Sequence, residues 1–348
     1  MIRSKKSVVG LDLGSSVVTA VELTLEGNEP VITGFSRVEL PPGGSVDEAV
    51  KQVFKEGKFR SKRVVTGVSG QDTVVRYLSM PRMTDEELRQ AIQFEADKLV
   101  ASDEEFIIDC APLGTIDGDE AADPAAGEMK VLVAACPRAR LEGQASMISE
   151  AGLTPIAIDL DMFAVANAWE LCVLPDADGA DAEDVRATAL VDVGAKTTSI
   201  NVMRGGVSCF SREIPIGGAN MTQAVSRRLG VEGFEAEAIK RAGEDHQAEV
   251  RTAIAPVLED LSSELALSMD YVEHNEGVTV TEILLSGGGV LAPGAVEAIE
   301  QSSARPTRTW NPLEGLHVDV DRLDVEELEA WAPSLVVAVG LASRVRHQ

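Results

Sequence analysis

Two segments of the chain carry an aspartate, a glycine and small polar residues at matching positions. Residues 12–16 read Asp-Leu-Gly-Ser-Ser, and residues 192–197, 180 positions later, read Asp-Val-Gly-Ala-Lys-Thr. In such a turn, backbone N–H groups and hydroxyls can bind phosphate oxygens, and the carboxylates can hold Mg²⁺ through water. Two such turns that face each other across a shared cleft are therefore predicted to clamp a polyphosphate.

A single Asp-x-Gly segment also fits an ordinary tight hairpin in which glycine serves the turn. Two copies in register, in separate halves of the chain, favour a ligand-binding function over that simpler interpretation. A third segment, Gly287-Gly288-Gly289, follows an apolar strand and opens a helix. Glycines at such a step let the backbone approach a ligand closely at a helix N-terminus.

The elements around these motifs are predicted to be strands in two similar halves of an α/β protein. Runs rich in Val and Ile are separated by Gly-Ser-Ser and Glu-Gly-Asn-Glu-Pro turns, as is typical of hairpins. Around the first motif the predicted strands are Val8–Leu13, Val17–Leu25 and Val31–Leu40; around the second they are Ala189–Val193, Thr198–Met203 and Val207–Pro215.

A smaller α+β unit is predicted within the first half, over residues 82–158. Thr84 and Glu87 form a capping box that opens a helix with an apolar stripe, and strands follow it. Two acidic stretches without a basic residue, Asp117–Glu128 and Pro175–Asp184, read as a solvated loop and as the main domain boundary.

Composition limits the kinds of partner and compartment that fit this chain. The 348 residues suggest two or three domains, and 31 basic against 57 acidic residues give a net charge of −26. Such a charge repels nucleic-acid backbones and anionic lipid, so neither is an expected partner. The longest later apolar runs, Val131–Cys136 and Leu335–Ala342, are too short to span a bilayer. Four widely spaced cysteines fit a reducing compartment.

Other catalytic motifs fit less well. The segment Gly287–Ala292 matches the loose dinucleotide fingerprint, but the region about 20 residues later has two prolines and no acid. Gly67–Gly70 stops short of a nucleophile elbow, because residue 71 is Gln. The four histidines are scattered, which argues against a metal cluster or a catalytic triad.

The ordered set of motifs resembles the actin-like ATPase superfamily, within it the FtsA/PilM branch, and most closely the PilM family. The segments that carry this resemblance are Val9–Ser16, Leu190–Ala195, Arg212–Gly218, Ala236–Lys240, Leu284–Gly289 and Ala338–Ala342. The resemblance implies duplicated actin-like (ribonuclease H-like) lobes with an inserted small α+β subdomain. It implies a first lobe from residues 1–81, 159–175 and 333–348, an insertion at 82–158, and a second lobe at 188–332 with a helical subdomain at about 220–279.

The same resemblance implies a site for ATP and Mg²⁺ between the lobes. The implied phosphate-loop residues are Asp12, Gly14, Ser15 and Ser16 in the first lobe and Asp192, Gly194, Lys196 and Thr197 in the second. Asp12 and Asp192 are the implied catalytic carboxylates, which hold Mg²⁺ through water. The adenosine side is implied to include Gly287, Gly288 and Gly289, with Glu237 and Lys240 near the ribose and base, while Gly217 and Gly218 form a turn with a nucleotide contact nearby. An acid–base pair such as Glu237 and Lys240 also fits a solvated helix surface.

One position departs from the family pattern. Relatives commonly carry a lysine where this chain has Thr19, which keeps a hydroxyl donor without the charge. Because a charge-assisted contact contributes about 1.5–3 kcal/mol, its loss corresponds to roughly 10- to 150-fold in binding or transition-state stabilisation. Lys196 could replace it from the opposite turn. We therefore expect nucleotide binding with slow hydrolysis or none, so that enzyme activity is a weak ATPase at most.

The resemblance also implies a cytoplasmic adaptor of type IV pilus assembly. Its implied partner is the N-terminal tail of a PilN-like inner-membrane protein, which recruits the chain to the inner face of that membrane. The tail is implied to lie between the first lobe and the insertion, with the helix Thr84–Val100 as one wall. Other pilus assembly proteins are further candidate partners, and the oligomeric state stays open.

Two alternative functions remain open on the same fold. One is an FtsA-like filament-forming division protein, although the expected amphipathic membrane-targeting tail does not follow Arg344–Gln348. The other is an ATPase or sugar-kinase-like phosphotransferase, which requires a catalytic carboxylate such as Asp159 or Asp161.

Overall fold

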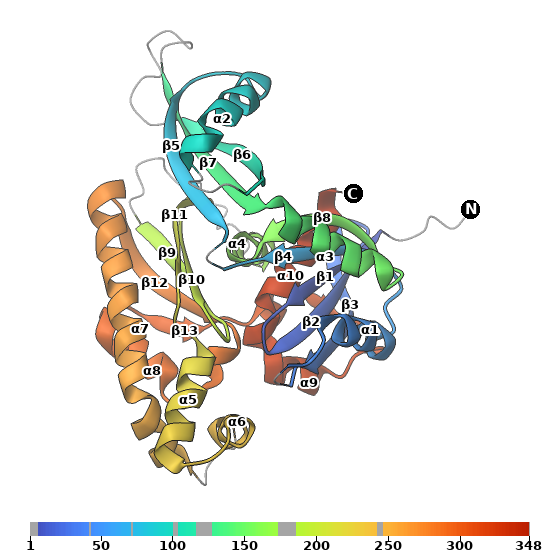
Figure 1. The fold of residues 1–348 in the computed structure, drawn as a ribbon, viewed down its shortest axis with the longest axis vertical. Helices are drawn as coiled ribbons and strands as arrows, with labels where there is room; N and C mark the ends of the chain where they lie inside the picture. The colour runs from blue at the N-terminus through green and yellow to red at the C-terminus, as the bar shows by residue number, and fades with distance from the viewer. Residues whose placement is uncertain are drawn as a thin grey trace.

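The computed structural model describes residues 6–41, 43–70, 72–99, 104–115, 127–172, 186–241 and 246–347. Two lobes lie side by side, and a smaller unit projects from them (Figure 1). Of the two predicted acidic loops, residues 175–184 and nearly all of 117–128 lie outside the described residues.

A six-stranded sheet in the order β14-β3-β2-β1-β4-β8 forms the first lobe. Its strands are β1 (Ser7–Leu13), β2 (Val17–Glu26), β3 (Glu29–Glu39), β4 (Arg63–Val68), β8 (Thr154–Leu160) and β14 (His317–Val318). Strands β1 to β3 run antiparallel, whereas β4 and β8 run parallel to β1. Helices α1 (Val46–Gly57) and α3 (Arg138–Glu150) cover one face of this sheet. Because helices cover both faces, the central strands are apolar along nearly their whole length.

The second lobe repeats this order in the sheet β11-β10-β9-β12-β13. Its strands are β9 (Arg186–Val193), β10 (Thr198–Arg204), β11 (Val207–Ile214), β12 (Thr279–Ser286) and β13 (Thr307–Thr309), and its helices are α5 (Gly218–Leu229), α6 (Gly233–Arg241), α7 (Gln247–Glu276) and α8 (Ala295–Ser303). The first hairpin pairs Asp12 with Thr19, and the second pairs Asp192 with Ser199. The repeat seen in the sequence is therefore a structural duplication in the same register, as predicted.

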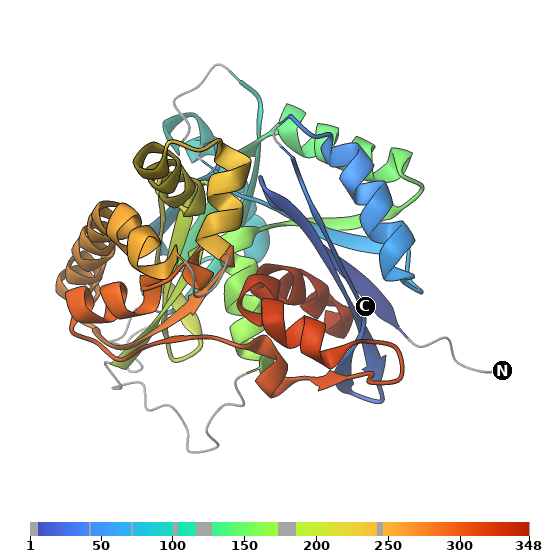
Figure 2. The same ribbon diagram turned by 90° about the horizontal axis from the view of Figure 1, so that it is seen from below.

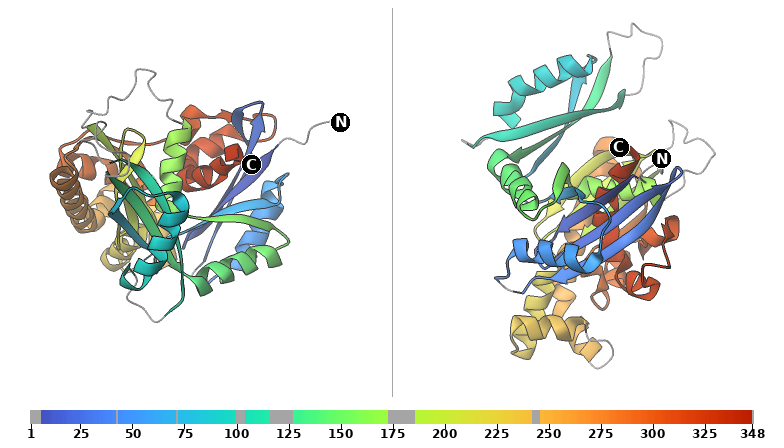
Figure 3. Two further views of the ribbon diagram at one scale, coloured as in Figure 1. Left: turned by 90° about the horizontal axis from the view of Figure 1, so that it is seen from above. Right: turned by 90° about the vertical axis from the view of Figure 1, so that its right-hand side faces the viewer.

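The insertion is a three-stranded antiparallel sheet with one helix on it (Figure 3). The sheet order is β5 (Val74–Pro81), β7 (Glu128–Pro137) and β6 (Phe106–Thr115), and the helix is α2 (Asp85–Leu99). Leu88 and Ile92 of α2 pack on the sheet. The predicted capping box is present, since the Thr84 N–H donates to Glu87 Oε2 over 2.9 Å.

Strand pairing divides the chain differently from the predicted limits. Strand β5 lies in the sheet of the insertion although it precedes residue 82, and β8 lies in the six-stranded sheet although it begins within 82–158. Helix α3 also packs on the first lobe, through Ile148. Strand β14 likewise joins the first-lobe sheet from within the segment 188–332. Short apolar strands look alike in sequence, and only long-range pairing decides which sheet they join.

Two helices, α4 (Asp161–Cys172) and α10 (Val336–Ala342), pack against each other between the two larger sheets (Figure 2). They share a core with Leu190, Met203 and Leu284 of the second lobe. The remaining segments are α9 (Val325–Trp331) and the 3₁₀ turns η2 (Gly288–Leu291), η3 (Pro312–Gly315), η4 (Ala332–Leu335) and η5 (Ser343–His347).

The C-terminal segment Val325–Arg346 is long and apolar enough to cross a membrane, and 61% of its most apolar window is buried inside the fold. Every residue of α10 is buried, against β1, β2, β4 and α4. The apolar character of this segment therefore matches its place in the core of the first lobe.

A fully buried carboxylate, Glu22 on β2, ties the first lobe together. Glu22 Oε1 accepts hydrogen bonds from Ser7 Oγ (2.8 Å) and from the N–H groups of Arg60 (3.0 Å) and Ser61 (2.7 Å). Glu22 Oε2 accepts one from Thr33 Oγ1 (3.0 Å) and lies 3.7 Å from Arg322 Nη1. A buried charge is tolerated when it is bonded this completely.

Candidate functional site

The two predicted phosphate turns are the tips of the hairpins β1–β2 and β9–β10. In the second turn, the Gly194 N–H donates to the Thr197 carbonyl over 2.9 Å, which closes the turn. The side chains of Ser15, Ser16 and Lys196 are exposed at these tips. Two hydroxyls and one ammonium group are thus accessible beside the aspartates that end β1 and β9.

Three carboxyl groups gather where the lobes meet: Asp12, Asp192 and Asp161, the first residue of α4. Burial raises the pKa of Asp12 well above its ordinary value, and the charges on Asp161 and Asp192 raise it further. Burial also raises the pKa of Asp192, although a 2.7 Å hydrogen bond from Ser286 Oγ opposes the rise. Because the charges of Asp161 and Asp192 both act on Asp12, the aspartates of the two repeats lie near one another.

Asp161 is the residue of this cluster that sequence reasoning assigned only to the phosphotransferase alternative. Burial raises its pKa to about 6, a hydrogen bond with Ser69 opposes the rise, and the charges of Asp192 and Glu213 add to it. Its Oδ1 atom is buried, with no hydrogen-bond partner among the described residues. A Cβ atom at Gly67 would lie 1.8 Å from this oxygen, so only glycine leaves room for the carboxylate. The sequence did offer a signal for Asp161, because it is an acidic residue directly between a predicted strand and a predicted helix.

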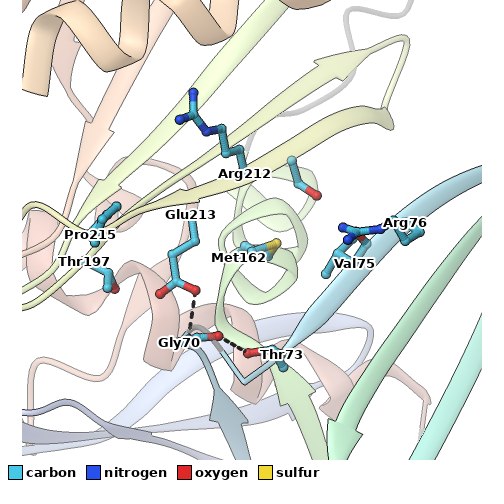
Figure 4. A pocket seen from close by; sticks show the side chains of 10 residues that line it. Gly70, Thr73, Val75, Arg76, Met162, Thr197, Arg212, Glu213 and Pro215 are labelled. Atoms are coloured by element: carbon cyan, nitrogen blue, oxygen red, sulfur yellow. Dashed lines mark hydrogen bonds between the residues drawn. The ribbon is translucent and has the colours of Figure 1, made fainter. Parts of the chain in front are cut away.

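A pocket of about 290 Å³ adjoins the cluster, between the start of β5 and the hairpin β10–β11 (Figure 4). Thr197 of the second turn and Met162, next to Asp161, line it. Glu213 reaches across it and accepts a 2.9 Å hydrogen bond from the Gly70 N–H, which joins the two lobes. Glu213 was not predicted, because its partner lies 143 residues away.

The glycine segment 287–289 lies directly against the second hairpin. Gly287 has a φ of +89°, and a Cβ atom there would lie 2.4 Å from the Val193 carbonyl oxygen. Gly288 begins the short 3₁₀ turn η2 where a helix was predicted to open, and the next α-helix, α8, begins at Ala295. A Cβ at Gly289 would meet the Val193 side chain at 2.4 Å. Glycine is needed here because two stretches of backbone touch.

Gly217 and Gly218 begin α5 against the same turn. The N–H groups of Gly218 and Ala219 donate to the carbonyls of Gly194 (2.9 Å) and Ala195 (2.7 Å). These two N–H groups of the first helical turn are therefore already hydrogen-bonded, and the start of α5 stabilises the second phosphate turn.

Glu237 and Lys240 of α6 do not form a solvated surface pair. Lys240 is only 7% exposed and donates to Glu237 Oε2 (2.7 Å), Thr222 Oγ1 (2.8 Å) and the Gly218 carbonyl (3.2 Å). Burial lowers the pKa of Lys240 despite the neighbouring Glu237 charge. Burial alone would raise the pKa of Glu237, but Lys240 outweighs it and leaves the pKa low. Lys240 therefore lies buried against Gly218 rather than in solvent.

Thr19 lies in the sheet rather than on the turn. It is 4% exposed, and its cross-strand neighbours are Asp12 on β1 and Arg37 on β3. A lysine at this position would start beside the Asp12 carboxyl. The structure thus brings Asp12 and Asp192 near each other and adds Asp161 and Glu213 to them.

Comparisons with known proteins agree with this architecture. The family described as Type IV pilus assembly protein PilM matches residues 10–346. A solved PilM–PilN type IV pilus biogenesis complex superposes with a TM-score of 0.84 at 27% identity, over 97% of this chain and 98% of the other. The ethanolamine utilization protein EutJ from Carboxydothermus hydrogenoformans superposes with a TM-score of 0.54 at 15% identity, over 97% of this chain and 89% of that chain, which shows the fold alone.

Curated relatives match over shorter stretches. The cell division protein FtsA of Bacillus subtilis (strain 168) is 28% identical over 262 residues, 67% of this chain and 57% of that protein. EutJ of Escherichia coli (strain K12) is 32% identical over 120 residues, 34% of this chain and 39% of that protein. The chain thus spans less than two thirds of the length of these relatives. The lobes have the actin-like ATPase fold, as predicted, and the chain belongs to the PilM family of type IV pilus assembly proteins.

Proposed function

We propose that this pilus assembly protein is an ATP-binding adaptor. ATP with Mg²⁺ would lie between the two hairpin turns, and the N-terminal cytoplasmic tail of a PilN-like inner-membrane protein would bind beside the insertion. The chain would work in the cytoplasm at the inner face of the inner membrane. The observation that carries the nucleotide part is the convergence of Asp12, Asp161 and Asp192 in one half-buried cluster.

The residues of this cluster fit a magnesium nucleotide. Three half-buried carboxyl groups with raised pKa values, one of which has a buried oxygen without a hydrogen-bond partner among the described residues, favour a nearby cation. The exposed Ser15, Ser16 and Lys196 supply hydroxyl and ammonium donors for anionic oxygens. Bound Mg²⁺ would supply positive charge that offsets both the carboxylates and the phosphates.

Slow or absent hydrolysis follows from the residue types at the turns. Thr19, in the sheet beside Asp12, offers no positive charge to the terminal phosphates. Asp161 and Asp192 are the carboxylates available to orient a water, and the raised pKa of Asp161 makes it a better proton acceptor than an ordinary aspartate. These groups can position a nucleotide, whereas charge stabilisation of the transition state would rest on Lys196 and the metal.

The partner part rests on the solved PilM–PilN complex and on an open strand edge. Strand β8 is the edge of the six-stranded sheet, and no described strand pairs with its outer side. Its apolar residues, Ile156 and Ile158 among them, are only half-buried, unlike those of β1. An extended peptide could add a strand there, with backbone bonds for affinity and side-chain pockets for selection. A pocket of about 250 Å³ next to Arg344, which pairs with Asp159 of β8 at 2.8 Å, lies nearby.

Two titrations test these parts separately. Calorimetry with ATP–Mg²⁺ should show binding to the unmodified chain and a clear loss for Asp192→Ala and Asp12→Ala; equal affinity in all three would remove both carboxylates from the site. Fluorescence anisotropy with a labelled peptide of the PilN-like tail should show a loss for Ile158→Asp. The matched control is Ile107→Asp on β6, the edge strand of the insertion, where Ile107 is 37% exposed. An equal loss in both variants would contradict docking on β8.

A further inference from the structure

One cation joins the two lobes beside the proposed nucleotide site. Arg241, the last residue of α6, lies with its Nη1 2.6 Å from Glu39 Oε1 at the end of β3. Its Nε lies 2.8 Å from Glu237 Oε1 on its own helix. Burial opposes its charge, but the bonds to Glu39 and Glu237 outweigh burial and raise the pKa of Arg241. A second-lobe arginine is therefore bound to both lobes at once.

A tryptophan of the first lobe completes this contact. The Trp331 ring lies 3.5 Å from the guanidinium carbon of Arg37 and 5.9 Å from that of Arg241, both within cation–π range. Two residues later, the Pro333 carbonyl accepts a 2.7 Å hydrogen bond from the Gly287 N–H. The arginine contact is thus connected on one side to Glu237 and on the other to the glycine segment.

The other contacts between the two lobes are of a different kind. Helices α4 and α10 pack tightly between the sheets, and Tyr77 of the insertion hydrogen-bonds to Ser208 (2.6 Å) and Ser211 (3.1 Å) of the second lobe. These contacts are buried or neutral and insensitive to salt. By contrast, Arg241 is 37% exposed and Glu39 is 59% exposed, so salt screens their attraction. The insertion also carries an ion pair to the second lobe, Lys130–Glu276, but those side chains are only 23% and 30% exposed, so salt screens the Arg241–Glu39 pair more strongly.

From this contrast we propose that Arg241 is a latch that holds the lobes closed over bound nucleotide, and that breaking its contact with Glu39 limits nucleotide release. The inference rests on the proposed function. Arg241 acts by positioning α6, and with it Glu237 and Lys240, against the first lobe. Because the latch is ionic and exposed, nucleotide release should accelerate as ionic strength rises.

The experiment measures dissociation of a fluorescent ATP analogue with Mg²⁺ by stopped-flow chase with unlabelled ATP. Arg241→Ala and Glu39→Gln are each expected to speed release about two- to fivefold at low salt, and the double variant no more than either alone. Arg241→Lys should recover part of the effect. The matched control is Arg251→Ala, which removes an exposed arginine that pairs with Glu297 within the second lobe. This control should leave the rate unchanged.

A second measurement needs no nucleotide. Acrylamide quenching of tryptophan fluorescence should increase modestly in Arg241→Ala, because the Trp331 ring loses one of its two arginine neighbours while Arg37 stays over it, and Trp331→Phe should abolish that increase. Release from Arg241→Ala at the rate of the unmodified chain, at low and high salt, would overturn the latch alone. Failure of the unmodified chain to bind the analogue would overturn the proposed function and the latch with it.

Discussion

Asp12 and Asp192 hold the same position in two hairpins of one register, and their charges interact where the lobes meet. Each is the penultimate residue of its first strand, with Thr19 and Ser199 opposite. Repulsion between them adds to burial in raising the pKa of Asp12. Ionising these carboxyl groups together therefore costs stability, and a nearby cation would lower that cost.

Removing one of these charges should make the nucleotide-free protein more stable and weaken its binding of nucleotide. Asp12→Asn is expected to raise the free energy of unfolding of the nucleotide-free protein by about 1–2 kcal/mol, because a buried, repelled charge is replaced by a neutral amide. Affinity for ATP–Mg²⁺ should fall in the same variant. Urea unfolding and calorimetry measure the two effects, with the exposed Asp321→Asn as control. A variant that is both less stable and unaltered in binding would contradict the proposed site.

The pH dependence of stability should carry the signature of Asp161. Its pKa is about 6 in the folded protein and 3.8 as the ordinary value, so the folded state binds the proton more tightly. The resulting stabilisation is fully present below about pH 4 and is lost as pH rises through 6, with a magnitude on the order of 2–3 kcal/mol. In urea unfolding at pH 4 to 7, Asp161→Asn should flatten this part of the profile. Parallel profiles for both proteins would refute the assignment.

Thr19→Lys should strengthen nucleotide binding. The new ammonium group would start beside Asp12, at a position that is 4% exposed, and would relieve part of the carboxylate repulsion. We expect roughly 10- to 150-fold tighter binding of ATP–Mg²⁺ or faster turnover, the range of one charge-assisted contact. Calorimetry and a phosphate-release assay distinguish the two. The matched control is Thr19→Val, which adds no charge. Thr24→Lys, also on β2, is not suitable, because it would disturb the hydrogen bonds around Glu22.

Tyr77→Phe should loosen the insertion from the second lobe. The hydroxyl bonds Ser208 and Ser211, and burial raises the pKa of Tyr77 despite these bonds. Ser208 keeps its 2.6 Å bond to Asn201, so the expected loss is about 1 kcal/mol of unfolding free energy, with faster hydrogen exchange in β5. The chain has only two tyrosines, and the other, Tyr271, is 57% exposed. Tyr271→Phe is thus the natural control. Equal rates of hydrogen exchange in β5 in both variants would show that the Tyr77 hydroxyl does not hold the insertion to the second lobe.

Glu22→Ala should be the most destabilising of these changes. It leaves the N–H groups of Arg60 and Ser61 and the guanidinium of Arg322 without their buried acceptor, at a cost of about 3–5 kcal/mol. Urea unfolding against Glu29→Ala, an exposed site on β3, measures it. If the two variants unfold alike, the network does not support the first lobe.

The repeat of Asp12 and Asp192 could be predicted because the signal is local. A hairpin joins residues that are close in sequence, so strand, turn and strand are all visible within about 15 positions. The capping box at Thr84 is local for the same reason. These short-range patterns gave the two lobes and most of the candidate site.

What the sequence could not show depends on long-range pairing. Arg241 and Glu39 are 202 residues apart, and Glu213 and Gly70 are 143 apart. Neither residue of such a pair carries a pattern that points to its partner. The allocation of β8 to the first lobe likewise depends on pairing with β4, because its own apolar residues fit either sheet.

The insertion belongs by chain connection to the first lobe, yet its strand β5 is bound to the second through Tyr77, and Lys130 of β7 pairs with Glu276 of α7. Because the insertion contacts both lobes, a rotation of one lobe relative to the other would either move the insertion or break these bonds. A change in the angle between the lobes would therefore reach the outer end of the insertion.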